Sequence, residues 1–455
     1  MKEKTRLGLY MFTPIIGGAE QYLKDLVWNI QRERYEITLF YDSWKDLEEF
    51  LELDACPDVC GCPIGLFEVR RRSGKKRPDK RPRLFGRFMS SGPVRAVKRA
   101  LVLLYVYAML PINFLLLWLA FRKHKVDILH IVNGGYPGAI TARLAAIVAK
   151  LSGTKRCIMS VCNTPAPVAF PGIDEWLIDH CVARSLDTAV LPSDTLGRSL
   201  IERRGFPQAK VETIPYGVRC AEELARLPRE VTRQSDSAPL IGMVANFLTH
   251  KGHEHLVRAM ASLKSRFPAL RAILIGDGPT RGAIQELVEK EDLADRVTFS
   301  GFCELSETLS LMATLDMLVH PSELEGMPYV ILHAMSLGKP VIASNVGSIR
   351  DILHSGESGI VVPARDSNVL AEAIASLLSD RAKLQRMGAA ALDRYCLEFS
   401  LKRMLQQHES LYDRIVKQTG RDENACASTV ITSPARALPG RKAPSFREAS
   451  GKELA

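Results

Sequence analysis

Short apolar runs alternate along the chain with longer amphipathic segments. In the first half, runs of strand type span 7–12, 36–41, 127–132, 156–161 and 188–191, and helical patterns span 21–30 and 139–150. An alternation of strands and helices is typical of a parallel sheet with helices on both faces. The pattern therefore predicts a doubly wound α/β domain over residues 1–220.

The alternation pauses over the polar residues 221–238, which we interpret as a linker, and then starts again. In the second half, strand-type runs span 240–245, 271–275, 297–299, 317–319, 341–343 and 360–362, and helices span 253–267 and 283–291. They predict a second Rossmann-like domain, 239–398. We expect the two domains to face each other across a cleft at the carboxyl ends of their strands, where ligands bind.

The end of the chain carries one more helical pattern. Residues 399–417 predict a final amphipathic helix. Residues 418–455 hold Ala, Ser, Pro and Arg with little apolar content, so we predict a disordered tail there.

Length and composition agree with two globular domains. The chain has 455 residues, 46% of them hydrophobic and 25% charged, which excludes a wholly disordered chain and a polytopic membrane protein. The net charge of +10 is local, because residues 70–99 hold 13 Lys or Arg against the single acid Asp79. The ten cysteines are scattered and predict free thiols in a reducing compartment. Cys56, Cys60 and Cys62 lack the partners of a metal site.

An uncharged segment of 21 residues, 101–121, follows the basic run and is interrupted by Pro111. Its length would suffice to span a bilayer. Crossing would place strands of one sheet on opposite sides of the membrane, however. The remaining interpretations are a monotopic helix in the interface, a re-entrant hairpin bent at Pro111, or a buried helix. A basic run beside an apolar helix favours membrane association of 70–125 with an anionic surface over nucleic-acid binding.

The most informative motif is a glycine loop between a strand and a helix. The run 321–343 contains an acidic loop around Glu325 and Gly326, a helix that begins near Pro328, and a stop at Gly338. Such a loop directs backbone N–H groups and the helix dipole at an anion. The Glu325 carboxylate offers acceptors for sugar hydroxyls.

This run resembles the donor loop of the GT-B glycosyltransferases of family 4, also called glycosyl transferases group 1. The matching positions are Pro321, Ser322, Glu325, Gly326, Ala334, Gly338, Pro340, Val341 and Ala343. The second glutamate of the family's motif falls on His333, whose imidazole could accept one hydrogen bond from a ribose or could simply be packed on its helix.

Other loops extend the resemblance over about residues 5–415. Lys251 matches the lysine that grips the donor diphosphate, and Asn246 stands where an arginine is common. Gly276 opens a Gly-Asp-Gly-Pro turn, and Phe302 belongs to the loop near the nucleobase. The Gly17-Gly18 pair resembles the loop that approaches the donor phosphates.

The resemblance implies transfer of a sugar from a nucleotide diphosphate sugar to an acceptor hydroxyl, with retention and without a divalent metal or other cofactor. His130 ends a strand and could face the acceptor or merely end that strand. The helix that begins near residue 399 would return to the first domain. The implied catalytic residues are Glu325, Lys251 and His130. The implied donor-binding residues are Gly17, Gly18, Asn246, Lys251, Gly276, Phe302, Glu325, Gly326, Met327, Pro328, Tyr329 and His333.

The leading interpretation is a peripheral, monotopic enzyme on the cytosolic face of a membrane. Its expected partners are a UDP- or GDP-sugar, a lipid-linked or glycan acceptor and an anionic membrane surface, but no nucleic acid. The alternative is a non-catalytic GT-B scaffold of a polysaccharide or glycolipid assembly, suggested by the departures from the family's usual residues at Asn246, Val132, Cys162 and His333. An epimerase or phosphorylase of the same fold fits less well, because the family 4 loops match in order.

Overall fold

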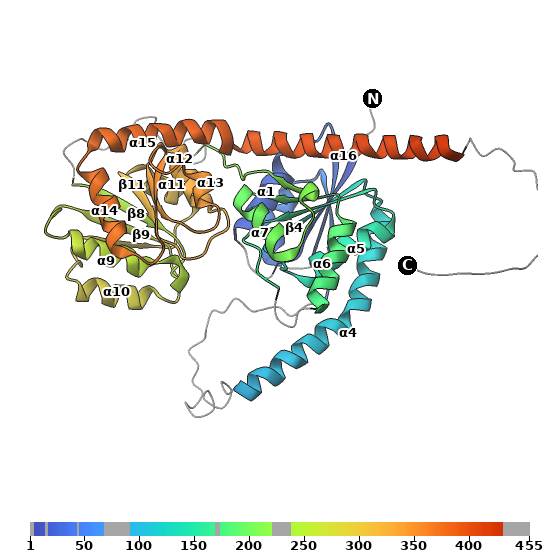
Figure 1. The fold of residues 1–455 in the computed structure, drawn as a ribbon, viewed down its shortest axis with the longest axis horizontal. Coiled ribbons are helices and arrows are strands. Elements are labelled where there is room, and N and C mark those ends of the chain that lie inside the picture. Colours follow the sequence, from blue (N-terminus) through green and yellow to red (C-terminus); the bar gives the residue numbers. More distant parts are fainter. Residues whose placement is uncertain are drawn as a thin grey trace, which may run out of the picture.

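The computed structural model describes residues 4–13, 17–42, 45–67, 92–168, 173–220 and 238–430. Two parallel sheets, each with helices on both faces, lie side by side, and each forms its own domain (Figure 1). The prediction of two doubly wound α/β domains is confirmed. The predicted linker lies almost wholly outside the described residues.

The first sheet has the order β3-β2-β1-β4-β5-β6-β7, with every described pair parallel. Its strands are β1 (Thr5–Met11), β2 (Tyr35–Asp42), β3 (Val59–Ile64), β4 (Ile128–Asn133), β5 (Arg156–Val161), β6 (Thr188–Leu191) and β7 (Val211–Thr213). Its helices are α1 (Gly18–Asn29), α2 (Lys45–Leu51), α4 (Gly92–His124), α5 (Ile140–Ser152), α6 (Ile173–Ser185) and α7 (Asp194–Arg204). The edge strand β3, which the pattern did not predict, carries Cys60 and Cys62, and both thiols are free.

The second sheet has the order β10-β9-β8-β11-β12-β13 and is also parallel. Its strands are β8 (Leu240–Val244), β9 (Arg271–Ile275), β10 (Val297–Gly301), β11 (Met317–His320), β12 (Val341–Ser344) and β13 (Gly359–Val362). Its helices are α9 (His253–Leu263), α10 (Arg281–Lys290), α11 (Leu305–Ala313), α12 (Tyr329–Ser336), α13 (Ile349–Ile352), α14 (Ser367–Leu378) and α15 (Arg381–Arg394).

Both sheets reverse their strand order at a central pair. In the first sheet, β1 has β2 on one side and β4 on the other, so β1 and β4 are the central pair. In the second sheet, β8 has β9 on one side and β11 on the other, so β8 and β11 are the central pair. Loops that leave such a pair diverge and open a crevice at the carboxyl ends of the strands. Gly17 and Gly134 follow the first pair, and Asn246 and Glu325 follow the second.

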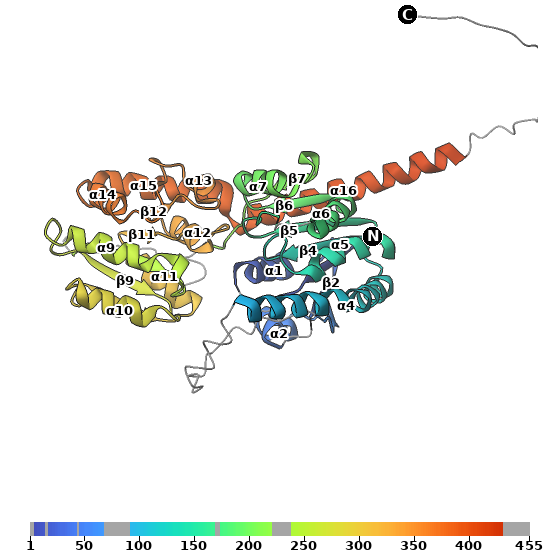
Figure 2. The same ribbon diagram turned by 60° about the horizontal axis from the view of Figure 1, so that its bottom comes forward.

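The last helix ties the second domain to the first. α16 (Leu401–Val430) follows α15 and runs along the first domain (Figures 1 and 2). Its buried Leu411, Tyr412 and Ile415 join the same apolar core as Leu7 and Tyr22. The helix continues to Val430, so the prediction that residues 418–430 belong to a disordered tail is wrong.

The apolar segment forms one long helix, α4. Pro111 lies inside it without ending it, so the interpretation of a hairpin bent at Pro111 is wrong. By length and composition alone, Leu104–His124 could cross a membrane. The helix lies between β1 and β4 in the chain, however, and these strands pair directly. The strands that precede and follow α4, β3 and β4, therefore belong to one sheet.

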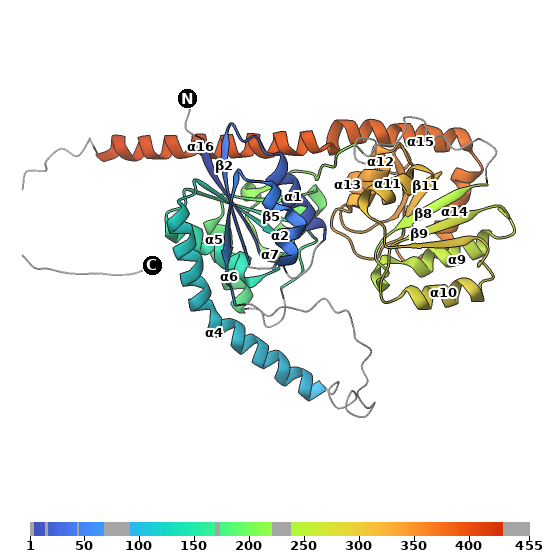
Figure 3. The ribbon, with the colours of Figure 1, turned by 180° about the vertical axis from the view of Figure 1, so that it is seen from behind.

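The two faces of α4 differ. Leu117 and Phe121 are buried, and the Phe121 ring packs edge-on against Tyr10 and Phe40. On the other face, large apolar side chains are 39–67% exposed, so the interpretation of a buried helix is wrong. These exposed residues, which we call the α4 apolar face, are Leu104, Tyr105, Tyr107, Ile112, Leu115 and Leu119. The first half of α4 stands clear of the other helices (Figures 1 and 3). Most of the basic run lies outside the described residues.

Candidate functional site

A cavity of about 670 Å³ lies between the two domains and is lined from both. From the first domain it receives Gly17, Gly18, Ala19, Glu20, Gly134, Cys162, Asn163 and Tyr216. From the second domain it receives the following residues, among them most of the predicted donor-binding residues: Val244, Ala245, Asn246, Lys251, Ile275, Gly276, Phe302, Cys303, Thr308, His320, Glu325, Gly326, Met327, Pro328, Tyr329 and Val330. The structure thus brings together every predicted donor-binding residue except His333.

The centre of this cavity is the carboxylate of Glu325, which is 8% exposed. Its Oε1 lies 2.6 Å from Nζ of Lys251 and 2.8 Å from Nε2 of His320. Burial alone would raise the pKa of Glu325, but the hydrogen bond and charge of His320, with the Lys251 ammonium, lower it to about 2. Glu325 is therefore ionised at neutral pH, and a lysine able to meet an anion is held beside it.

A glycine fixes the position of Lys251. Gly252 follows it with φ of 76°, a left-handed conformation that non-glycine residues rarely adopt. A Cβ atom there would also overlap the carbonyl oxygen of Pro321 at the start of the acidic loop. The backbone next to Lys251 and the backbone at the start of the loop that carries Glu325 are therefore in direct contact.

The first domain brings the N-terminus of α1 to the same cavity. The amide of Gly17 donates to Oε2 of Glu20 at 2.7 Å. Gly18 and Ala19, whose amides lack partners within the helix because they lie in its first turn, line the cavity. A Cβ on Gly18 would lie 3.7 Å from the Tyr329 ring at the start of α12. Two helix N-termini therefore converge beside Lys251, an arrangement that favours an anion.

Contacts between the domains close over the acidic loop. The Thr164 hydroxyl donates to the carbonyl oxygen of Glu325 at 2.8 Å. The rings of Tyr216 and Tyr329 stack with centroids 5.2 Å apart. Gly326 packs so tightly that a Cβ would lie 2.8 Å from the carbonyl oxygen of Cys162. The donor loop is thus positioned by the first domain as well as by its own.

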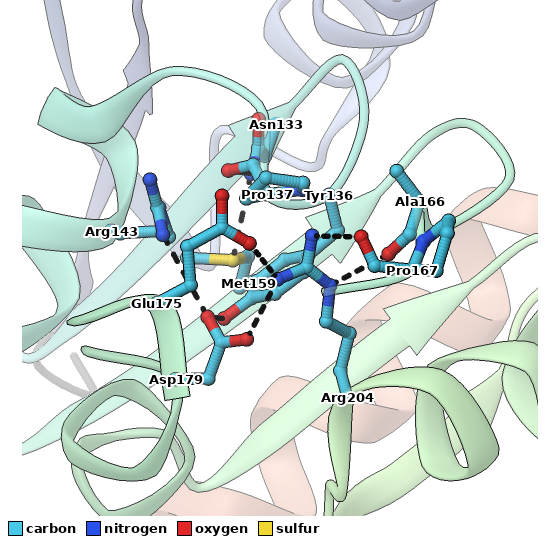
Figure 4. A network of polar contacts seen from close by, with 10 residues as sticks. All are labelled: Asn133, Tyr136, Pro137, Arg143, Met159, Ala166, Pro167, Glu175, Asp179 and Arg204. Carbon is cyan, nitrogen blue, oxygen red and sulfur yellow. Dashed lines mark hydrogen bonds and ion pairs between the residues drawn. The ribbon is translucent and has the colours of Figure 1, made fainter. Parts of the chain in front are cut away.

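A buried polar network supports the segment that carries Thr164 (Figure 4). The guanidinium of Arg204 on α7 pairs with Asp179 at 3.1 Å and with Glu175 at 2.8 Å, both on α6. The same guanidinium donates to the carbonyl oxygens of Ala166 at 2.7 Å and Pro167 at 3.3 Å. Two helices and the loop after β5 are therefore held by one buried arginine.

His333 lines a second cavity, of about 620 Å³, which adjoins the first. The side chain is buried, and burial lowers the pKa of its imidazole to about 4, so it is neutral at pH 7. Its Nδ1 has no hydrogen-bond partner among the described residues.

His130 lies away from both cavities, which corrects its prediction as a catalytic residue. The ring is 0% exposed, beneath α16, with Nδ1 2.7 Å from the Tyr412 hydroxyl and Nε2 2.7 Å from the Ser160 hydroxyl. It also stacks on His408. His130 lies within β4 rather than at its end, and its side chain points into the core, so it belongs to the packing of α16.

Sequence reasoning missed several residues of the site. His320 directly follows the predicted strand 317–319 and was not singled out, although its imidazole bonds Glu325 five residues later. Asn163 and Thr164 were not singled out, and the signal that could have found them is their position directly after a β-strand of the first sheet. Among the described residues no three His, Cys, Asp or Glu side chains gather as metal ligands.

Family comparisons cover most of the chain. Residues 16–222 match the family described as Glycosyltransferase Family 4, and residues 227–394 match the family described as Glycosyl transferases group 1. Among the curated proteins it resembles the alpha-D-kanosaminyltransferase of Streptomyces kanamyceticus, 28% identical over 53% of this chain and 64% of that protein. It also resembles the N-acetyl-alpha-D-glucosaminyl L-malate synthase of Bacillus anthracis, 26% identical over 65% of this chain and 77% of that protein. The chain thus spans less than two thirds of the first relative's length and about three quarters of the second's.

Solved structures share the fold. A glycosyltransferase from Rickettsia africae superposes with a TM-score of 0.67 at 18% identity, over 91% of this chain and 99% of that one. The Anabaena protein HepE, solved in complex with UDP, superposes with a TM-score of 0.64 at 17% identity, over 90% of this chain and 100% of that one. At these identities the likeness establishes the two-domain architecture.

Proposed function

The chain belongs to the GT-B glycosyltransferases of family 4, and we propose that it moves a sugar from a nucleotide diphosphate sugar to an acceptor hydroxyl. The observation that carries this proposal is the ion pair of Lys251 and Glu325 between two helix N-termini. This combination offers cationic groups for a diphosphate and a carboxylate for sugar hydroxyls in one cavity.

The leaving group is a diphosphate, so catalysis chiefly requires stabilisation of the developing negative charge. In the free protein Lys251 is held by Glu325. We propose that the donor diphosphate draws the ammonium of Lys251 to itself, together with the first-turn amides of α1. Glu325 would keep its bond to His320 and turn its other oxygen to the sugar. No step in this proposal requires a metal ion.

We further propose that the transfer retains the anomeric configuration. In this scheme the acceptor attacks on the face that the diphosphate leaves, and a phosphate oxygen takes the acceptor proton. The Glu325 carboxylate is ionised, and its pKa of about 2 makes it a poor base, while the Glu20 carboxylate accepts a hydrogen bond from the Gly17 amide. A mechanism in which a phosphate oxygen of the donor receives the proton suits a site whose Glu325 carboxylate is a poor base.

The acceptor is proposed to be a lipid-linked or polysaccharide-precursor molecule at the cytosolic face of a membrane. Support comes from the α4 apolar face, which the domain leaves uncovered. The C-terminal end of α4 leads into the start of β4, so its first half extends towards the side of the sheet where the strands have their carboxyl ends (Figure 1). A bilayer that covered the α4 apolar face would hold a lipid acceptor near the cleft.

The donor base is left open between uracil and guanine. HepE is described as a complex with UDP, and a Mycobacterium tuberculosis relative, 29% identical over 195 residues, is described as GDP-mannose-dependent. A transfer assay with labelled UDP- and GDP-sugars and a membrane lipid extract tests the proposal. We expect one donor to label a lipid, with the donor's anomeric configuration in the product, and Glu325→Gln to abolish the labelling. A folded protein that binds no nucleotide would instead support the non-catalytic scaffold.

A further inference from the structure

The short helix α13 of the second domain lies beside helix α7 of the first (Figure 2). The side chain of Asp351 on α13 uses both of its oxygens on one residue of α7. Its Oδ2 accepts a hydrogen bond of 2.9 Å from the amide of Thr195, and its Oδ1 accepts one of 3.0 Å from the Thr195 hydroxyl. This pair is therefore a direct polar contact between the two domains.

Thr195 lies in the first turn of α7, where backbone amides have no partner within the helix. Ser193, which caps this helix, accepts a hydrogen bond from the amide of Leu196 at 3.3 Å. The amide of Thr195 is satisfied from the other domain, by Asp351. A carboxylate at a helix N-terminus also interacts favourably with the helix dipole. The contact thus combines two hydrogen bonds with a favourable charge.

Helix α13 is joined to the donor loop. The amide and the hydroxyl of the buried Ser348 both donate to the carbonyl oxygen of Gly326, at 3.0 and 2.6 Å. Gly347 has φ of 56°, and a Cβ atom there would lie 2.3 Å from the carbonyl oxygen of Glu325. The start of α13 and the loop that carries Glu325 therefore form one packed unit.

The carbonyl end of α13 is fixed as well. Arg394, at the end of α15, donates from Nη2 to the carbonyl oxygen of Asp351 at 2.8 Å and from Nε to that of Ile352 at 2.7 Å. The Arg394 side chain is largely buried. Because these bonds and the donor loop hold the backbone of α13, the Asp351 carboxylate cannot shift without disturbing that loop.

The other end of α7 reaches the same loop by a second route. Arg204, in the last turn of α7, donates to the carbonyl oxygen of Ala166. Two residues before Ala166, the hydroxyl of Thr164 donates to the carbonyl oxygen of Glu325. The 11 residues of α7 span about 17 Å. This one helix therefore connects the first domain to the donor loop at both of its ends.

We propose that Asp351 and Thr195 are positioning residues for sugar transfer, because their contact sets the place of the donor loop relative to the first domain. The proposal rests on the proposed function, since it concerns the transfer that Glu325 and Lys251 support. The cavity around Glu325 is lined by neither member of the pair. Without the contact, fewer molecules would hold Glu325 and the N-terminus of α1 together around the donor.

The test is a double-mutant cycle on kcat/KM of the full chain, with the nucleotide sugar that the labelled-donor assay identifies. Asp351→Ala removes both hydrogen bonds and the charge, so it should lower kcat/KM by about tenfold. Thr195→Val removes only the hydroxyl and should lower it by about threefold. The double variant should be no slower than Asp351→Ala, because the two residues act through one contact. Thr195→Ser keeps the hydroxyl and should transfer at the wild-type rate.

The control is Asp380→Ala. Asp380 also caps a helix, accepting from the amide of Lys383 at 2.8 Å, but both residues belong to α15 and its start in the second domain. This variant should lower the free energy of unfolding and leave kcat/KM unchanged. If Asp351→Ala does not fold, Asp351→Asn, which keeps the shape and removes the charge, takes its place in the cycle.

Two results would overturn the proposal and leave the proposed function standing. One is an Asp351 variant with the wild-type kcat/KM. The other is a double variant slowed by about thirtyfold, the product of the two single losses, because such additivity shows that the residues act independently. A folded wild type that transfers no sugar overturns both the positioning role and the proposed function.

Discussion

The ammonium of Lys251 lies 2.6 Å from Oε1 of Glu325, although 74 residues separate them in the chain. Each side chain comes from a loop that follows one of the two central strands of the second sheet, β8 and β11. The strand order therefore places a cation and an anion in contact at the carboxyl edge of that sheet, where the first domain closes over them.

Lys251→Met should slow sugar transfer by on the order of 10²- to 10³-fold, as loss of a group that stabilises transition-state charge usually does. The measurement is the steady-state transfer rate with the nucleotide sugar that the labelled-donor assay identifies. Lys290→Met is the control, because Lys290 is exposed on α10. A rate for Lys251→Met within threefold of the wild type would contradict the role assigned to this ammonium.

Gly252→Ala should destabilise the second domain. The left-handed conformation alone costs about 1–2 kcal/mol for a residue with a side chain, and the overlap with the Pro321 carbonyl adds to this. Urea unfolding measures the loss. Gly282→Ala on α10 is the matched control, since its new methyl group would meet nothing within 4 Å, and helix propensity predicts a gain of up to about 1 kcal/mol. Equal stabilities for the two variants would refute the argument.

Arg204→Met should lower the free energy of unfolding by about 3–5 kcal/mol, because it leaves the buried Asp179 without its closest cation. It should also weaken donor binding, since Arg204 holds the segment that carries Thr164 to the Glu325 loop. The control is Arg198→Met on the same helix. Among the described residues, the Arg198 side chain makes an exposed hydrogen bond to Thr195, so its removal should change neither the free energy of unfolding nor donor binding. Unfolding and nucleotide titration of both variants check this.

His408 should make the protein acid-sensitive. It accepts a hydrogen bond from the Tyr22 hydroxyl beneath α16, and burial lowers the pKa of its imidazole to about 4 from an ordinary 6.5. The unfolded chain therefore binds this proton first as pH falls. The contribution of His408 is fully present above pH 6.5 and is lost between pH 6.5 and 4, by roughly 2 kcal/mol at pH 5.

The charged and titratable groups around His408 include His130, Tyr22 and Tyr412, so the test is a difference between variants. His408→Gln keeps a side chain able to bond Tyr22 but does not titrate. Its melting temperature should fall less than that of the wild type between pH 7 and pH 5. An identical fall in both proteins would show that another group causes the acid sensitivity.

The α4 apolar face should bind the protein to membranes. Replacing Leu115 and Leu119 together by Gln removes two large exposed side chains from it without touching the buried Leu117 and Phe121. We expect the wild type to float with vesicles that contain anionic lipid and the double variant to remain largely in the soluble fraction. Leu151→Gln, an exposed leucine on α5, is the control and should float like the wild type. A double variant that floats equally well would contradict the proposal.

The sequence predicted what local pattern determines. β5 and β6 begin and end at the predicted residues, because each is a short apolar run between polar turns. The donor loop was also readable, since its proline and glycines fix a strand, a turn and a helix within about twenty residues. These residues line one cavity because the loops that follow parallel strands all lie at the carboxyl edge of the sheet.

What the sequence could not show depends on distant contacts. His130 was open to two interpretations because its partner Tyr412 lies 282 residues further along the chain. The end of α16 was placed too early because the residues after 417 lack the apolar spacing on which that prediction rested.

The measurement that tests the account most directly is a calorimetric titration of the full chain with UDP, GDP and ADP, repeated with Lys251→Ala. A ligand at about 100 times its dissociation constant would also stabilise the fold by roughly 2.7 kcal/mol, which a thermal melt can verify. We predict that one nucleotide binds at a single site and that Lys251→Ala weakens it at least tenfold. Binding of no nucleotide by the folded wild type, or binding that Lys251→Ala leaves unchanged, would contradict the account.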